Sequence, residues 1–353
     1  MYEVLMFSAF FSGFVLILLF FYRSSLEFLS DGELAHRRDE LPDITVVVPT
    51  YNEEENITQK LENLDSADYP EEKYEVLVVD GGSDDGTKEL AEDYAEFIDM
   101  GERGKIKAMN RGIEEADSRY VLFTDADVFM EQKALRNAAG YIGDGIGAVG
   151  GSGEIIADGF MSEEKKQYYE EDWWMRCRES EIDSACSLDG KFILLDTEAL
   201  DSIDESSFTD DQQITLDLWK KGYRSVVVED VVVREYAKKS VLEDINQMRR
   251  RCRLSIATSF SNLEILKKPS LYSWWIFPFR RLFNYMLPVF LGVISVFLLV
   301  YEPLILLSLV CLDAVLSVIS PKVRYYNLLL LALSLSWFDI FTGNVRKGCR
   351  WSY

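Results

Sequence analysis

The sequence is short of the residues on which several common enzyme and metal sites depend. It contains one histidine, His36, which lies in a charged stretch. Its five cysteines are odd in number and have no metal-ligand spacing, which favours reduced, unpaired thiols. Catalysis by histidine, and metal sites built from several histidines, are therefore nearly excluded.

Positive charge is also scarce. The 353 residues include 60 acidic and 37 basic side chains, and the formal net charge is -23. A general nucleic-acid-binding protein needs a basic face, so we expect no nucleic-acid partner. An acidic surface also suits a salt-rich cytoplasm, although the paired lysines argue against extreme adaptation. The glycine-rich loop Asp80–Thr87 lacks the Gly-x-Gly-x-x-Gly pattern, which argues against a dinucleotide site at that loop.

An uncharged run at the N-terminus, Val4 to Tyr22, is long enough to cross a bilayer, since a spanning helix needs about 20 residues. It lacks the basic start and small-residue cleavage site of a signal peptide. Arg23 follows it, so the positive-inside rule places the bulk of the chain on the cytoplasmic side. We predict a retained anchor over residues 1–23 and a linker over residues 24–41.

Three further apolar segments of near-minimal spanning length lie towards the C-terminus: Leu282–Val300, Pro303–Ile319 and Tyr325–Phe341. The basic link Lys322 to Arg324 fits a cytoplasmic loop, so the first two segments predict a hairpin. Whether the third spans stays open, because spanning would place the basic tail, residues 346–353, outside. We predict an interfacial segment over residues 269–281 and a membrane region of two or three helices over residues 282–345.

Residues 42–268 lie between the predicted linker and the predicted interfacial segment, and we predict that they form a soluble domain. Runs that predict buried strands are Ile44–Val48, Glu75–Val79 and Tyr120–Thr124. Segments with helical patterns follow them, over residues 52–64, 87–98 and 104–116. The alternation predicts an α/β fold built on a doubly wound, mostly parallel sheet.

Polar clusters follow each of these strands: Thr50–Glu53, Asp80–Thr87 and Asp125–Asp127. In open parallel sheets, ligands bind at the carboxyl ends of the strands. We therefore expect the three clusters to converge at one edge of the sheet.

Asp125 and Asp127 flank one alanine at a strand end, so their side chains share a face. Carboxylate oxygens suit Mg²⁺ or Mn²⁺, which commonly take one or two carboxylates plus substrate phosphates. Taken alone, the pattern is more typical of solvated acids in a strand-end turn. It points to metal binding only together with the neighbouring clusters.

Asp80 begins a glycine-rich loop whose backbone can approach a ligand closely. Its carboxylate is a candidate acceptor for a nucleobase or ribose. Lys105 and Lys107 follow Gly104 at the start of a predicted helix, where a cation suits a diphosphate. A solvated surface role for these lysines stays open.

The ordered motifs "VVVPTYNEEENI", "EVLVVDGGSDDGT", "GKIKAMNRGI" and "VLFTDADV" closely resemble the family-two glycosyltransferases. The later segment "FTDDQQITLDLWKKGYRSVVVED" resembles that family's acidic catalytic segment. The resemblance covers about Ile44 to Arg253 and implies a GT-A-like nucleotide-diphosphosugar transferase fold. In this register Asp211 takes the place of the catalytic base and Asp210 that of the preceding acid.

The resemblance also implies binding roles. Donor-binding residues would be Thr50, Glu53, Asp80, Lys105, Asp125, Gln247 and Arg250. Asp127, with Asp125, would hold the divalent cation, and Asp189 and Gly190 would lie beside the acceptor. Gln247 and Arg250 match the Gln-x-x-Arg-Trp pattern of processive members, but Arg251 replaces the tryptophan. This departure favours transfer of one sugar over polymer synthesis.

The resulting hypothesis is a membrane-bound, inverting glycosyltransferase that uses Mn²⁺ or Mg²⁺ and a nucleotide-diphosphate sugar. Its acceptor would be a lipid-linked or other glycan at the cytoplasmic face of the cell membrane. A processive polysaccharide synthase and a non-catalytic nucleotide-sugar-binding scaffold stay open. A sugar nucleotidyltransferase would show a glycine-rich N-terminal loop, where this chain reads "PTYNEEEN". Asp211 also suits a helix cap, and both roles are compatible.

Overall fold

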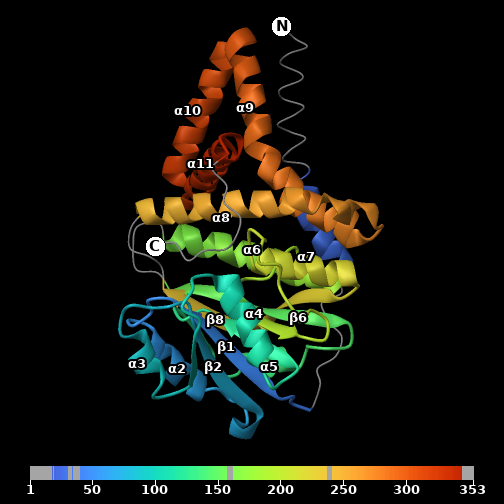
Figure 1. Ribbon diagram of the computed structural model, residues 1–353. Coiled ribbons are helices and arrows are strands. Elements are labelled where there is room, and N and C mark those ends of the chain that lie inside the picture. The colour runs from blue at the N-terminus through green and yellow to red at the C-terminus, as the bar shows by residue number, and fades with distance from the viewer. Residues whose placement is uncertain are drawn as a thin grey trace.

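The computed structural model describes residues 18, 20–30, 34, 40–156, 162–236 and 241–343. Most of the predicted N-terminal anchor and the predicted tail lie outside these residues. Residues 20–29 are helical and lie against the rest of the protein. Figure 1 shows a sheet domain below, a layer of helices above it, and a projecting pair of helices.

The sheet has eight strands in the order β3-β2-β1-β4-β7-β6-β8-β5. The strands are β1 (Ile44–Thr50), β2 (Tyr74–Asp80), β3 (Glu96–Asp99), β4 (Tyr120–Thr124), β5 (Val128–Met130), β6 (Ile146–Ile156), β7 (Phe192–Asp196) and β8 (Arg224–Tyr236). Strands β1, β2, β3 and β4 pair in parallel, so their carboxyl ends lie at one edge.

The prediction of a mostly parallel sheet is confirmed for six of the eight strands, since β6 and β8 pair in parallel and run in the same direction as β1 to β4. Strands β7 and β5 run the other way, so the sheet is mixed. β7 runs antiparallel to both β4 and β6, and β5 runs antiparallel to β8. In the β4–β7 pair, Thr124 lies opposite Phe192. The amino end of β7 therefore meets the carboxyl end of β4, and the loop before β7 reaches the edge that carries Asp125.

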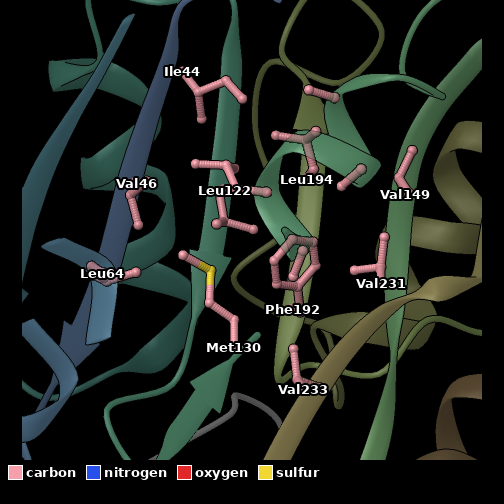
Figure 2. Close-up of a cluster of buried hydrophobic side chains, with 14 of the residues drawn as sticks. Ile44, Val46, Leu64, Leu122, Met130, Val149, Phe192, Leu194, Val231 and Val233 are labelled. Carbon is pink, nitrogen blue, oxygen red and sulfur yellow. The ribbon is translucent and has the colours of Figure 1, made fainter. Parts of the chain in front are cut away.

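Helices cover both faces of the sheet. α2 (Ile57–Asp65) and α5 (Ala134–Ala139) pack on one face. α4 (Lys105–Glu115), α6 (Ser162–Ile182) and α7 (Asp211–Lys221) pack on the other. The alternation along β1 explains this, because Val46 and Val48 belong to the first core and Val47 to the second. Figure 2 shows the first core, with side chains from adjacent strands in contact.

The predicted helix over residues 87–98 is wrong beyond its first turns. α3 spans only Thr87–Ala91, and residues 96–99 form β3 on the edge of the sheet. Backbone bonds from Tyr94 and Ala95 to the carbonyl of Ala91 close the helix. Residues 96–99 then pair with β2, beginning with Glu96 opposite Leu77. The backbone hydrogen bonds of this pairing stabilise a strand in place of the predicted helix.

α8 (Val241–Ser261) lies across the top of the domain, and α9 (Asn284–Tyr301) and α10 (Pro303–Ile319) project from it as a pair (Figure 1). Among the described residues, one helix, Tyr272–Tyr301, is long and apolar enough to cross a membrane. The helix Pro303–Ile319 is apolar but shorter. The first of the three predicted C-terminal spans is thus supported, whereas most of the predicted N-terminal span lies outside the described residues.

The third predicted apolar segment forms α11 (Pro321–Phe341) and packs against α8. Its inner face is buried, including Ala332, Ser336 and Asp339. Asp339 forms ion pairs with Arg249 at 2.5 Å and with Arg253 at 3.4 Å, both on α8. These contacts hold the C-terminal half of α11 against α8.

Candidate functional site

The predicted nucleoside-binding residues meet at the ends of β1 and β2. Thr50 lies opposite Asp80 in the ladder, and its hydroxyl donates to the Asp80 carboxylate at 3.0 Å. The other Asp80 oxygen accepts from the amides of Gly82 and Ser83, at 2.9 and 2.7 Å. Gly82 has φ +79°, which favours glycine. Buried Asp80 thus shapes the glycine-rich loop.

Glu53 joins the turn after β1 to the start of α3. Its amide donates to the Thr87 hydroxyl at 2.8 Å, and its carboxylate accepts from Asn56 at 2.8 Å. The same carboxylate lies close enough to Asp127 to raise the pKa of that residue. Glu53 therefore connects the first polar cluster to the third.

Lys105 joins two acidic segments that are far apart in the sequence. Its Nζ lies 2.7 Å from Asp125, which follows β4, and 3.1 Å from Asp210, which precedes α7. The lysine is at the first position of α4. Lys105, a predicted donor-binding residue, therefore lies between the two acidic motifs. The sequence did not indicate that Lys105 would pair with Asp210.

Asp125 and Asp127 belong to a strongly acidic cluster. Burial raises the pKa of Asp125, and Asp127 adds to the effect, while Lys105 opposes it. Asp127 is exposed at its surface, but desolvation by the surrounding protein still raises its pKa, with further contributions from Glu235 and Glu53. A bound cation would relieve this repulsion, because it stabilises the ionised carboxylates.

Across the described residues, no group of three or more histidine, cysteine or acidic side chains is arranged to hold a metal ion by itself. Asp125 and Asp127 supply hard oxygen donors, which fit Mg²⁺ or Mn²⁺. Such ions commonly complete their coordination with substrate phosphates and water. The residues present therefore fit a cation that arrives together with a diphosphate.

Asp210 and Asp211 lie at the N-terminus of α7 in different surroundings. Burial opposes ionisation of Asp210, but Lys105 outweighs it and lowers the pKa of that residue. Burial, Asp210 and Asp189 together raise the pKa of Asp211 to about 6. Asp211 also accepts from the amide of Gln212 at 2.7 Å. The cap position of α7 is Asp210, which makes no side-chain cap bond, so the predicted cap role of Asp211 is reduced to this one bond from the neighbouring amide.

Asp189 and Gly190 reach the site in the loop before β7. A Cβ on Gly190 would lie 3.5 Å from the Lys105 Nζ and 3.6 Å from an Asp210 oxygen. Asp189 lies 3.3 Å from the Nζ of Lys191, which also pairs with Glu235 at 2.8 Å. The predicted acceptor loop therefore borders the two acidic motifs.

Lys60 is a site-forming residue that the sequence analysis missed. It is fully buried, and its Nζ donates to the Thr124 hydroxyl at 2.7 Å and to the Val128 carbonyl at 2.6 Å. Burial lowers the pKa of Lys60 to about 7, against the opposing effect of Asp125 and Asp127. The helical spacing of Ile57, Lys60, Leu61 and Leu64 was a usable signal, since it places a lysine on an apolar face.

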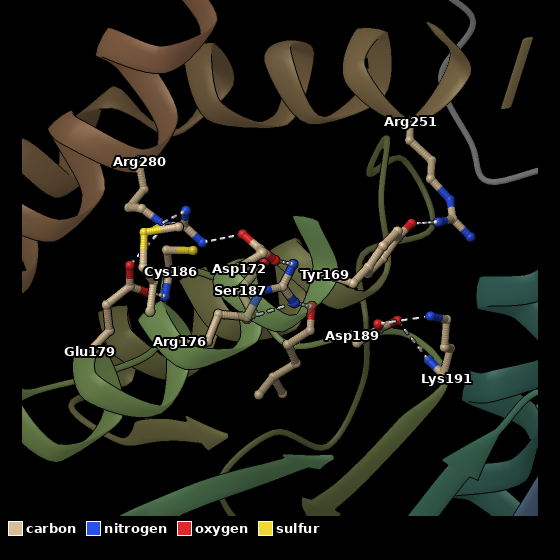
Figure 3. A network of polar contacts seen from close by, with 12 residues as sticks. Tyr169, Asp172, Arg176, Glu179, Cys186, Ser187, Asp189, Lys191, Arg251 and Arg280 are labelled. Carbon is tan, nitrogen blue, oxygen red and sulfur yellow. Dashed lines mark hydrogen bonds and ion pairs between the residues drawn. The ribbon is translucent and has the colours of Figure 1, made fainter. Parts of the chain in front are cut away.

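Gln247 and Arg250 lie half-buried on α8. Their donor-binding roles stay predictions. Arg251, which replaces the tryptophan of the processive pattern, donates to the Tyr169 hydroxyl at 3.0 Å. Figure 3 shows it reaching from α8 towards Tyr169, with Asp189 and Lys191 nearby.

The family comparison identifies the first part of the domain. Residues 45–203 match the model of Glycosyl transferase family 2. This segment is a family-two glycosyltransferase domain. It contains the residues of β1, β2, α4 and β4 discussed above, together with Asp189 and Gly190. Asp210, Asp211 and α8 lie beyond the matched range.

Curated relatives match the family-two domain locally. Glycosyltransferase AglE of Haloferax volcanii is 40% identical over 123 residues, which cover 33% of this chain and 40% of that protein. Poly-beta-1,6-N-acetyl-D-glucosamine synthase of Staphylococcus aureus is 40% identical over 102 residues, which cover 27% of this chain and 24% of the synthase. The chain thus matches less than half the length of these relatives.

A solved structure resembles nearly the whole fold. The mannosyltransferase PcManGT from Pyrobaculum calidifontis, determined in complex with GDP-Man and Mn²⁺, superposes with a TM-score of 0.75 at 22% identity. The superposition covers 92% of this chain and 94% of that chain. The family-two domain and the helices that follow it therefore share a GT-A-like fold with that protein.

Proposed function

We propose that this protein is a metal-dependent, inverting glycosyltransferase that uses a nucleotide-diphosphate sugar. The observation that carries the proposal is the position of Lys105, within 3.1 Å of both Asp125 and Asp210. It joins the strand-end acids of the family-two domain to the acidic segment beyond it. The similar fold of a mannosyltransferase solved with GDP-Man and Mn²⁺ supports the same donor class.

Each part of the donor has a matching group in this arrangement. The nucleoside would contact Thr50, Glu53 and the loop shaped by Asp80. Lys105 would turn from the carboxylates to the diphosphate, because a cation bound to Asp125 and Asp127 would replace its positive charge. When bound, that cation neutralises charge on the diphosphate as it leaves.

Asp211 is the proposed general base. Its raised pKa keeps it basic enough to accept a proton from the acceptor hydroxyl, and it is ionised near neutral pH. Asp210 is held by Lys105 and is a poorer proton acceptor because its pKa is lowered. Direct displacement at the anomeric carbon, with the base opposite the leaving diphosphate, inverts the configuration there.

We further propose that the protein works at the cytoplasmic face of the cell membrane on a lipid-linked or other glycan acceptor. The apolar helix Tyr272–Tyr301 and the exposed apolar side chains of α10 support a membrane-embedded part. Arg251, where processive relatives have tryptophan, supports transfer of a single sugar.

A processive polysaccharide synthase is the second candidate, because a poly-N-acetylglucosamine synthase matches the domain at 40% identity. The lengths of the products separate the two. A ladder of products that grows during one binding event would favour the synthase, and a single added residue would favour single transfer.

The test uses the full-length protein in membranes with Mn²⁺ and a panel of nucleotide-diphosphate sugars. Nucleotide release and the masses of extracted lipid products are measured with and without a chelator. We expect release with one donor, loss in chelator, and recovery with Mn²⁺ or Mg²⁺. Asp127→Asn should abolish release, whereas Asp201→Asn, at an exposed acid, should not. Donor binding without any nucleotide release would instead indicate a scaffold.

A further inference from the structure

A polar network lies between α6 and the first turns of the helix Tyr272–Tyr301, and its side chains are partly or fully buried (Figure 3). It contains three guanidinium groups, from Arg176, Arg280 and Arg281, and two carboxylates, from Asp172 and Glu179. The donor and metal groups described above are not part of it.

Two of the three arginines are neutralised by the carboxylates. Arg280 lies 2.5 Å from Asp172 and 2.8 Å from Glu179. Arg176 lies 2.7 Å from Asp172 and donates to the carbonyl of Leu188 at 3.0 Å. Glu179 is fully buried and also accepts from the amide of Cys186 at 2.9 Å. These contacts use both negative charges of the network.

Arg281 has only neutral oxygen partners within the described residues. It donates to the hydroxyl of Ser187 and, at 2.6 Å, to the hydroxyl of Tyr285. Its Nε is buried without a hydrogen-bond partner in the described structure. Asp172 also attracts Arg281 through space, but it is shared with the other two arginines of the network. Three guanidinium groups and two carboxylates leave the network one positive charge in excess, and burying such a charge is costly. An anion bound at Arg281 would remove that cost.

The position of Arg281 indicates where such an anion comes from. The arginine lies at the start of the apolar part of the helix Tyr272–Tyr301, the candidate membrane span. Its partner Ser187 precedes Asp189 of the acceptor loop by two residues. An anion held here has the apolar helix on one side and the acceptor loop on the other. The donor diphosphate has its own partner in Lys105, at the edge of the sheet.

We propose that Arg281, together with Ser187 and Tyr285, binds the phosphate group of a lipid-linked acceptor. This assignment rests on the proposed function and names its acceptor class. The alkyl chain lies along the apolar helix, and the phosphate lies at Arg281. The sugar or free phosphate oxygen that accepts the transferred residue then points past Asp189 towards Asp211.

The experiment measures lipid binding without donor, so it is independent of turnover. Full-length protein in neutral detergent is titrated with a fluorescent long-chain alkyl phosphate and with the matching alkyl alcohol. We expect the parent to prefer the phosphate. Arg281→Gln should lower phosphate affinity about tenfold or more, since hydrogen bonds to charged groups are strong. Arg281→Lys should retain part of the preference, and Tyr285→Phe should cause a smaller loss.

Control arms distinguish the possible sources of the anion. Arg111→Gln, on the exposed face of α4, should bind alkyl phosphate as the parent does. Donor affinity in Mn²⁺ should be unchanged in Arg281→Gln. Competition by inorganic phosphate as strong as that by alkyl phosphate would overturn a lipid site in favour of a free phosphate site. Normal alkyl phosphate binding by Arg281→Gln, or a loss of donor affinity alone, would also overturn the proposal. Absence of nucleotide release from every donor would refute the proposed function while leaving this binding result intact.

Discussion

The hydroxyl of Tyr22 donates a hydrogen bond of 2.7 Å to the carboxylate of Glu179, a residue 157 positions later in the chain. Glu179 also pairs with Arg280 and accepts from the amide of Cys186. One buried carboxylate thereby joins the N-terminal helical residues, α6, the acceptor-loop region and the apolar helix. The ring of Tyr22 stacks on Phe279 with centroids 4.1 Å apart, which supports the same junction.

Glu179→Gln should destabilise the protein strongly. The substitution leaves Arg280 with a weaker partner in a buried site, where breaking an ion pair costs about 3 kcal/mol or more. Tyr22→Phe keeps the stacked ring and loses one hydrogen bond, so we expect about 1 kcal/mol. Thermal unfolding in detergent measures both. Glu229→Gln, at an exposed partner of Arg178, is the control and should unfold as the parent does. Equal midpoints for Glu179→Gln and the parent would contradict the role of the junction.

Asp211→Asn and Asp127→Asn should separate chemistry from binding. Asn can still accept the amide of Gln212, so Asp211→Asn should fold and bind donor normally. Its turnover should fall by about 10² to 10⁴, the usual contribution of a general base. Asp127→Asn removes a charged oxygen ligand and should weaken Mn²⁺ and donor binding together. Donor titrations and nucleotide release measure the two effects. If Asp211→Asn kept turnover within about threefold of the parent, the base would lie elsewhere, with Asp210 the first candidate and Asp189 the second.

The pH dependence of turnover follows from the raised pKa of Asp211. Burial, Asp210 and Asp189 raise it to about 6, and the base must be ionised. Turnover should therefore rise as pH increases through about 6. The contribution of Asp211 to folding stability changes with pH in the opposite direction to turnover. Its protonated form is favoured in the fold, so this contribution is complete below the ordinary pKa of 3.8 and is lost as pH rises through about 6. Initial rates at saturating donor and Mn²⁺ test the first statement, and a flat profile would argue against Asp211 as base.

Lys60→Met should weaken the proposed cation site, although Lys60 is not one of the proposed cation ligands. The buried ammonium donates to the Thr124 hydroxyl and the Val128 carbonyl, on either side of Asp125 and Asp127. Methionine fills similar space but leaves both oxygens unpaired, which loosens the turn. We expect about tenfold weaker Mn²⁺-dependent donor binding, since about 1.4 kcal/mol is a factor of ten. Lys88→Met, at a half-exposed lysine of α3, is the control. Unchanged donor affinity in Lys60→Met would show that the turn holds without the ammonium.

Local patterns in the sequence were sufficient for the first half of the sheet and for the motifs at its edge. The predicted strands near residues 44, 75 and 120 are strands in the structure, because short β-branched runs bounded by turn residues specify buried parallel strands locally. The convergence of Thr50, Asp80 and Asp125 at one edge follows from parallel pairing alone. The family-two motifs were recognisable for the same reason, since each is a strand end and its turn.

Tertiary structure decided the features that depend on partners far apart in the chain. The antiparallel β7 brings Gly190 next to Lys105, and no local pattern distinguishes its direction. Residues 96–99 became β3 because the edge of β2 offered hydrogen bonds that a helix of the same residues could not match. The ion pair of Lys105 with Asp210 depends on the packing of α7 on the domain. The hydrogen bonds of Arg281 to neutral oxygens depend on the packing of the apolar helix. Charges are compensated between neighbours in space, which a linear sequence does not reveal.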